Sequence, residues 1–190
     1  MDGRQSKHLA RVRHLRETFA EANEHLANRL RAAADDEAEG ANGAAWSAAQ
    51  IGWHVAAVNT RFAALLAGDV PAAKPLEHGF VERPWAEVAA AIPAKLQAGA
   101  AAQPRGPVTR RDAIAALEAS AVKMARAFDT LTPERGAGTG VTNPMVGTVN
   151  LYQVGEWAVS HVWRHDVQVE RALADAPTRV PADGQARPSG

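Results

Sequence analysis

The chain has 190 residues, enough for one domain with a substantial core, and its formal net charge of +0 argues against a nucleic-acid partner, since nucleic-acid binders usually carry a basic excess. Cysteine is absent, which excludes disulfides, zinc–thiolate sites and a cysteine nucleophile within the chain. There is no signal-peptide pattern and no run of about eighteen apolar residues, so we expect a soluble, cytoplasmic protein without a membrane segment.

Alanine, the strongest helix former, supplies 43 of the 190 residues and predicts an all-α fold. The first of four long segments with helical periodicity covers about residues 6–33. Its apolar residues recur at three- and four-residue steps: Leu9, Val12, Leu15, Phe19, Leu26 and Leu30. The second segment ends near residue 66 and has these predicted buried positions: Ile51, Val58, Phe62 and Leu65. It begins either at Ser47, with Gln50 completing a capping box, or earlier with Asn42 as the N-cap.

The segment of residues 68–108 contains six prolines and is too long for a tight hairpin. We therefore expect a crossover between the second and third helices, with one short helix at about residues 84–92. The third long helix is predicted from Thr109, its N-cap, to Leu131.

A Gly- and Pro-rich stretch follows, over residues 133–144, and predicts a flexible connection or, alternatively, a lid. The fourth helix is predicted over residues 145–173, and residues 174–190 are predicted to be a disordered tail. Together these elements predict a single domain, residues 1–173, folded as a four-helix bundle with a long crossover.

Three of the seven histidines fall on predicted buried faces. His161 and His165 lie four residues apart within the apolar stripe of the fourth helix, so they share one face. His54 lies between Ile51 and Val58 on the buried face of the second helix. The other four are interpreted as ordinary surface residues: His8, His14, His25 and His78.

A buried histidine is either a hydrogen-bonded core residue or a ligand. Metal coordination by His54, His161 and His165 would satisfy all three rings at once, in a core with few other polar groups. Imidazole ligands suit zinc or nickel, and three ligands leave a position open for water or substrate. Gln50 and Gln168 each lie one helical turn from a histidine and could orient a ligand.

Other residues near these histidines have plainer interpretations. Arg164 and Asp166 are interpreted as a surface ion pair, with a position at the rim of the histidine pair as the alternative, and Ser160 is expected on a different face from His161. Three tryptophans are assigned to core packing, with a pocket wall or a dimer seam as alternatives: Trp53, Trp157 and Trp163. No catalytic side chain is assigned.

Two short motifs resemble signatures of the DinB/YfiT-like proteins. The stretch Trp46-Ser47-Ala48-Ala49-Gln50-Ile51-Gly52-Trp53-His54 is similar to their second-helix signature, and His161-x-x-x-His165 followed by Gln168 is similar to their fourth-helix signature. The resemblance implies a four-helix bundle with a divalent metal ion on His54, His161 and His165. Several members of that family are thiol transferases or mycothiol-dependent maleylpyruvate isomerases.

These observations lead us to expect a metal-dependent enzyme that acts on a small molecule. The resemblance implies S-transfer or thiol-dependent isomerisation with a low-molecular-weight thiol, and the Arg- and Ala-rich composition, typical of a GC-rich genome, favours mycothiol. Hydrolysis by a metal-activated water is a further option. The alternatives are a non-catalytic metal- or ligand-binding bundle and a metal-free dimerisation bundle; a homodimer is compatible with each.

Overall fold

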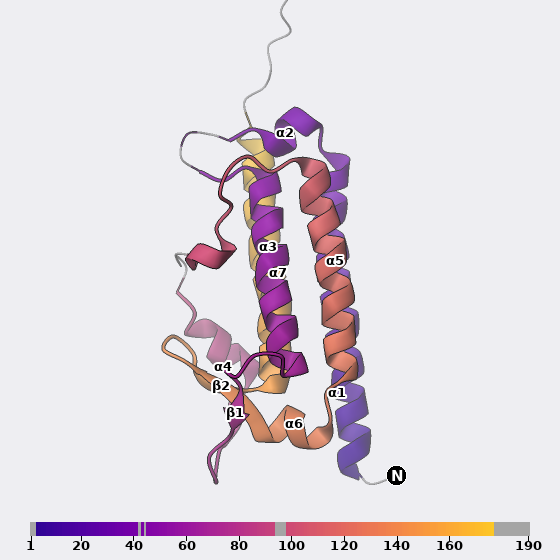
Figure 1. Cartoon of the computed structure of the whole chain (residues 1–190), viewed down its shortest axis with the longest axis vertical. Helices are drawn as coiled ribbons and strands as arrows, with labels where there is room; N and C mark the ends of the chain where they lie inside the picture. The colour runs from indigo at the N-terminus through magenta and orange to yellow at the C-terminus, as the bar shows by residue number, and fades with distance from the viewer. Residues whose placement is uncertain (1–2, 42, 44, 94–97, 177–190) are drawn as a thin grey trace, which may run out of the picture.

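The computed structural model of the chain describes residues 3–41, 43, 45–93 and 98–176. Four long helices form a bundle (Figure 1): α1 (Gly3–Ala32), α3 (Ala48–Ala67), α5 (Arg110–Asp129) and α7 (Leu151–Ala174). Helices α1 and α3 both pack against α5 and α7, so α1 and α3 occupy diagonal corners of the bundle. The predicted all-α four-helix bundle is confirmed.

The direction of the helices explains the long crossover. Helices α3 and α5 run the same way along the bundle, opposite to α1 and α7, so the chain must return along the full bundle between them (Figure 1). The returning segment contains strand β1 (Lys74–Pro75), helix α4 (Trp85–Ala90) and the short 3₁₀ helix η1 (Ala100–Ala102). The predicted crossover is therefore confirmed, and α4 is the short helix expected at about residues 84–92.

Local sequence signals fix the starts of two bundle helices. The Ser47 side chain accepts a hydrogen bond from the Gln50 backbone N–H, and Gln50 Oε1 accepts one from the Ser47 backbone N–H. This reciprocal capping box satisfies two backbone donors at the start of α3. At the start of α5 there is a single capping bond, in which the Thr109 side chain accepts from the backbone N–H of Asp112. The alternative N-cap, Asn42, lies outside the described residues.

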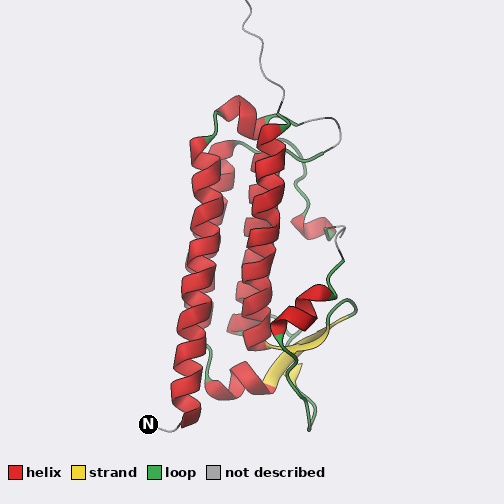
Figure 2. Cartoon of the chain, turned by 180° about the vertical axis from the view of Figure 1, so that it is seen from behind, coloured by secondary structure: helices red, strands yellow, loops and turns green. Residues whose placement is uncertain are grey.

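The region between α5 and α7 differs from the prediction. Residues expected to be a flexible connection form helix α6 (Pro133–Gly138) and strand β2 (Thr139–Asn143), which pairs with β3 (Gly147–Asn150) (Figure 2). The two strands are antiparallel, and β1 pairs with the other edge of β2. Because β2 is the central strand of a small sheet, the stretch is not a flexible connection; the lid alternative stays a prediction.

Helix α7 therefore begins later than the predicted residue 145. Asn150 caps it through the Gln153 backbone N–H, and Gln153 Oε1 accepts from the Asn150 backbone N–H. Because Val149 is fully buried in the strand that precedes this cap, the apolar residues before Asn150 belong to the hairpin rather than to the helix.

Three further details differ from the sequence-based expectations. A short helix α2 (Asp35–Glu39) occupies the acidic stretch after α1. At the start of α1, Leu9 is 49% exposed, whereas His8, expected at the surface, is buried and lies 2.7 Å from the Tyr152 hydroxyl. The polar end of Tyr152 explains why a histidine rather than a leucine faces inward there.

The predicted domain boundary at residue 173 falls at the end of α7. Ala174 is the last residue of α7, and residues 177–190 of the predicted tail lie outside the described residues. Within the described part of the chain, none of the helices combines the length and apolar character that crossing a membrane requires.

Candidate metal centre

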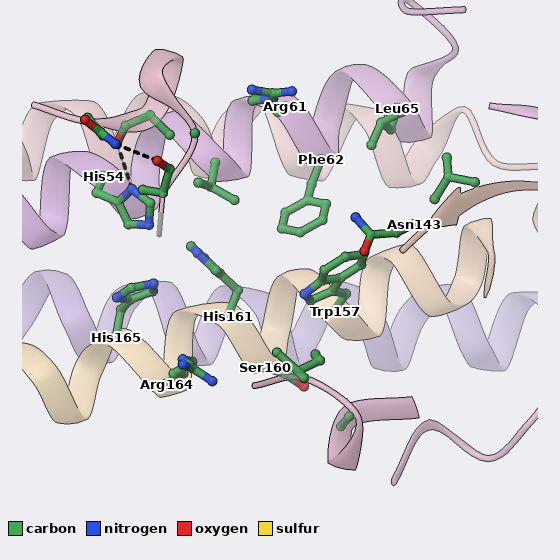
Figure 3. A pocket seen from close by; sticks show the side chains of 18 of the residues that line it. His54, Arg61, Phe62, Leu65, Asn143, Trp157, Ser160, His161, Arg164 and His165 are labelled. Carbon is green, nitrogen blue, oxygen red and sulfur yellow. Dashed lines mark hydrogen bonds between the residues drawn. The ribbon is translucent and has the colours of Figure 1, made fainter. Parts of the chain in front are cut away.

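The histidines singled out by sequence lie together where α3 and α7 face each other (Figure 3). Ring centroids are 4.4 Å apart for His161 and His165, 4.7 Å for His54 and His165, and 5.4 Å for His54 and His161. One ring nitrogen from each residue lies within 4.8 Å of the other two. These three side chains could hold a metal ion; binding itself stays a prediction.

Helix geometry brings the rings together. His161 and His165 are four residues apart on α7, so their side chains project from the same face one turn apart. His54 lies in the second turn of α3, which packs directly against α7. The antiparallel course of these two helices places the start of α3 beside the second half of α7 (Figure 1).

Hydrogen bonds fix the orientation of two rings. His54 Nδ1–H donates to the carbonyl of Ala102 at 2.7 Å, and His165 Nδ1–H donates to Gln168 Oε1 at the same distance. A neutral ring that donates from Nδ1 keeps a lone pair on Nε2, which is the arrangement of a metal-binding histidine held by an outer hydrogen bond. Gln168 thus contacts His165 as expected.

Gln50 does not take the corresponding role beside His54. Its Oε1 caps the start of α3, and its Nε2 donates to the carbonyl of Gly106 at 2.9 Å. The partner of His54 comes instead from the crossover, as the backbone carbonyl of Ala102. A backbone group carries no side-chain signal, so sequence reasoning could not identify it.

Burial keeps all three imidazoles in the neutral form that a metal requires. It holds the pKa of His161 well below 6.5, and the nearby rings and Arg164 lower that pKa further. Burial and the charge of His54 lower the pKa of His165 to about 4. The pKa of His54 is also lowered by burial, against the opposing effect of the Ala102 carbonyl. His161 Nδ1 is buried and has no hydrogen-bond partner among the described residues, so the donor set fits a divalent ion.

These pKa shifts predict that the metal-free protein loses stability as the pH falls. Below about pH 6.5 the histidines of the unfolded chain bind protons, whereas those of the folded chain bind them only at lower pH, because their pKa values are lower. Protonation therefore favours the unfolded state in this pH range. With a folded pKa of about 4, His165 alone would cost about 2 kcal/mol of unfolding free energy between about pH 7.5 and about pH 5. Urea titrations with chelator present measure this loss.

The control for that pH dependence is His165→Gln, which keeps a polar side chain but removes the titrating ring. Its unfolding free energy should fall less over the same pH interval than that of the wild type. A wild-type protein whose stability is unchanged between about pH 7.5 and about pH 5 would show that the rings are accessible to protons in the folded state.

The three histidines line one end of a cavity of about 1030 Å³. Its walls come from α3, the crossover, β2 and α7. Phe62 and Trp157 form an aromatic pair in its middle, with ring centroids 5.7 Å apart (Figure 3). Trp46 packs beside His54 at 5.2 Å between ring centroids. The site is therefore connected to a chamber large enough for a ligand.

The three tryptophans assigned to core packing have different surroundings in the structure. Trp157 lines the cavity, as the pocket-wall alternative required, whereas Trp53 and Trp163 are not among its described lining residues. Trp163 is 38% exposed and packs beside His25. Trp46 is a wall residue that the sequence analysis quoted only as part of a motif.

One other prediction about α7 is wrong. Asp166 is only 4% exposed and forms a paired hydrogen bond with Arg29 of α1, rather than a surface ion pair with Arg164. Arg164 lines the cavity, in agreement with the alternative position at the rim of the histidine pair. Ser160 also lines it, but its side chain points away from that of His161, as expected (Figure 3). Ser160 also accepts a hydrogen bond from Trp85 Nε1 at 2.8 Å, which ties the crossover to α7.

The fold and the site define a class of protein: a four-helix bundle with a long crossover, in which two adjacent helices present three neutral histidines to a cavity. The sequence profile of the DinB superfamily matches residues 14–169. The chain belongs to this superfamily, and the matched region includes all three histidines. A comparison with curated proteins gave no match.

Proposed function

We propose that the chain is a metal-dependent enzyme in which His54, His161 and His165 bind one divalent ion, zinc or nickel. The observation that carries the proposal is the convergence of three neutral imidazoles, with ring nitrogens within 4.8 Å of one another, on the wall of a large cavity. Imidazole is a good ligand for both metals. Three protein ligands leave the remaining position open, which is the pattern of catalytic sites.

The chain's own residues would hold and shield this centre. The carbonyl of Ala102 and the amide oxygen of Gln168 fix the rings of His54 and His165, so the ligands need little reorganisation. Phe62 and Trp157 cover the neighbouring cavity wall and limit access of bulk water. A bound ion supplies Lewis acidity, which lowers the pKa of a thiol or water that reaches the open position.

Of the two molecules that the metal centre could activate, a thiol or water, a thiol cosubstrate fits the chain better. The chain has no cysteine, so a sulfur nucleophile must come from a second molecule. The described lining residues include no carboxylate that could serve as a general base for water. Together with the family resemblance, this favours S-transfer or thiol-dependent isomerisation with a low-molecular-weight thiol such as mycothiol. At about 1030 Å³ the cavity is at the upper end of ligand pockets, with room for thiol and substrate.

Cobalt substitution tests the thiol part of the proposal. Adding mycothiol to the Co²⁺-loaded protein should produce a thiolate-to-cobalt charge-transfer absorption in the near ultraviolet, which the disulfide form of mycothiol should not produce. If the protein binds one metal ion but gives neither this absorption nor any thiol-dependent reaction, the non-catalytic metal-binding alternative is favoured. If no divalent metal binds at all, the proposed function is wrong.

A further inference from the structure

The charged side chains in the described lining of the cavity all have the same sign. Its described lining includes two cationic side chains, Arg61 of α3 and Arg164 of α7, and no aspartate or glutamate. The charged side chains of the described lining are therefore all positive, although the chain as a whole has a formal net charge of +0.

The two arginines lie on opposite walls of the cavity. Arg61 extends from the α3 side and Arg164 from the α7 side, flanking the row of rings that runs from His161 to Trp157 (Figure 3). Arg61 is exposed and Arg164 is half-buried, so both guanidinium groups belong to the solvent-facing edge rather than the floor. A guanidinium group binds planar anions through paired hydrogen bonds, which suits a carboxylate.

The part of the cavity beyond His161 is lined largely by apolar side chains (Figure 3). Phe62 and Trp157 occupy its centre, and further apolar side chains extend the wall: Val58, Leu65, Ile92 and Val141. Such a surface contributes to binding through buried apolar area, whereas the charged groups at the edge fix orientation. The ligand that fits this distribution has an apolar body and an anionic end.

We infer that the cavity takes a small organic anion whose aromatic or bulky apolar body packs against Phe62 and Trp157 and whose anionic group is bound at one wall of the cavity, by the guanidinium group of Arg61 or of Arg164. The inference rests on the proposed function in one respect: the anion is taken to be the substrate on which the metal centre acts. It places the ligand's apolar body beside His161, whose ring centroid lies 6.1 Å from that of Phe62.

A pair of probes that differ only in charge tests this inference. Naphthylacetate and its neutral analogue naphthylacetamide have nearly the same shape, and calorimetric titration of metal-free protein at low salt near pH 7.5 gives both affinities. The wild type should bind the carboxylate about tenfold more tightly than the amide, as expected for charge-assisted hydrogen bonds at a partly exposed site. Added salt should reduce that preference.

Variants assign the preference to the two arginines. In the double variant R61Q/R164Q the carboxylate should lose most of its advantage, while the affinity for the amide stays unchanged and shows that the cavity is intact. R171Q is the matched control, because Arg171 is an exposed arginine on α7 that does not line the cavity. It should leave both affinities as in the wild type.

Repeating the titrations with zinc-loaded protein separates this inference from the proposed function. If the carboxylate is preferred only when zinc is present, and equally in R61Q/R164Q, the anion binds the metal; the inference is then overturned and the metal centre stands. If the preference occurs in metal-free protein and depends on the arginines, the anion site stands even if no metal binds. Equal affinity for the two probes, or binding of neither, overturns the inference.

Discussion

Replacing His161 with alanine should abolish stoichiometric metal binding. Zinc sites with four ligands bind with about 10–16 kcal/mol, so each ligand contributes on the order of 3 kcal/mol, or about a hundredfold in affinity. His161 is one of the two proposed ligands on α7, with its ring centroid 4.4 Å from that of His165. Elemental analysis of dialysed protein should find about one divalent ion per wild-type chain and little in the variant.

The same variant should lose the response of its melting temperature to chelator. A bound ion stabilises the folded state by about 4 kcal/mol when present at about a thousand times its Kd, so chelator should lower the wild-type melting temperature by several degrees. The metal-free variant should still fold, because the substitution removes a buried Nδ1 that has no partner among the described residues.

His14→Ala is the matched control for this experiment. His14 is an exposed histidine on α1, outside the three-histidine cluster, so its replacement makes the same change in a helix without touching the site. It should keep the metal content and the chelator response of the wild type. Metal that remains bound in His161→Ala would show that the ion is held elsewhere.

The parts of the fold that sequence predicted depend on local signals. Apolar periodicity located the four helices, and the capping residues Ser47 and Thr109 marked two of their starts. The candidate site was found by the same reasoning, because four-residue spacing places His161 and His165 on one face and the apolar stripe of α3 includes His54. Each of these signals lies within a single helix.

The hairpin was missed although one local signal for it exists. Asn150 and Gln153 form the same kind of capping box as Ser47 and Gln50, and they mark the true start of α7. The apolar residues before Asn150 continue a helix-like pattern, which conceals that start. Strand β2 pairs with β3 and also with β1, about 65 residues earlier in the chain, and no local pattern carries information on the pairing with β1.

Polar residues with distant partners were the other source of error. His8 is buried because Tyr152 of α7 offers it a hydroxyl, and Asp166 is buried because Arg29 of α1 offers it a guanidinium group. Burial of such groups is favourable only when a partner satisfies them. Because the partners are more than 130 residues away in sequence, the helix patterns alone assigned both residues to the surface.

Replacing Gly140 with alanine should destabilise the protein by about 3 kcal/mol, the upper part of the usual range for overpacking. A Cβ at this position would lie 2.2 Å from the backbone oxygen of Val149, far closer than real Cβ atoms approach. Gly140 pairs with both Lys74 and Asn150 at the centre of the sheet, so neither neighbouring strand can move without losing its register. Thermal unfolding should show a melting temperature lower by roughly 5–10 °C.

Gly138→Ala provides the matched control, two residues earlier. A Cβ at Gly138 meets nothing within 4 Å, so that substitution should leave the melting temperature close to the wild-type value. A flexible connection would tolerate both changes equally, so equal melting temperatures would contradict the ordered sheet. The difference also matters for ligand binding, because β2 contributes Val141, Thr142 and Asn143 to the cavity wall. Gly140→Ala should therefore weaken binding of naphthylacetate and naphthylacetamide together, whereas removing the arginines should affect the carboxylate alone.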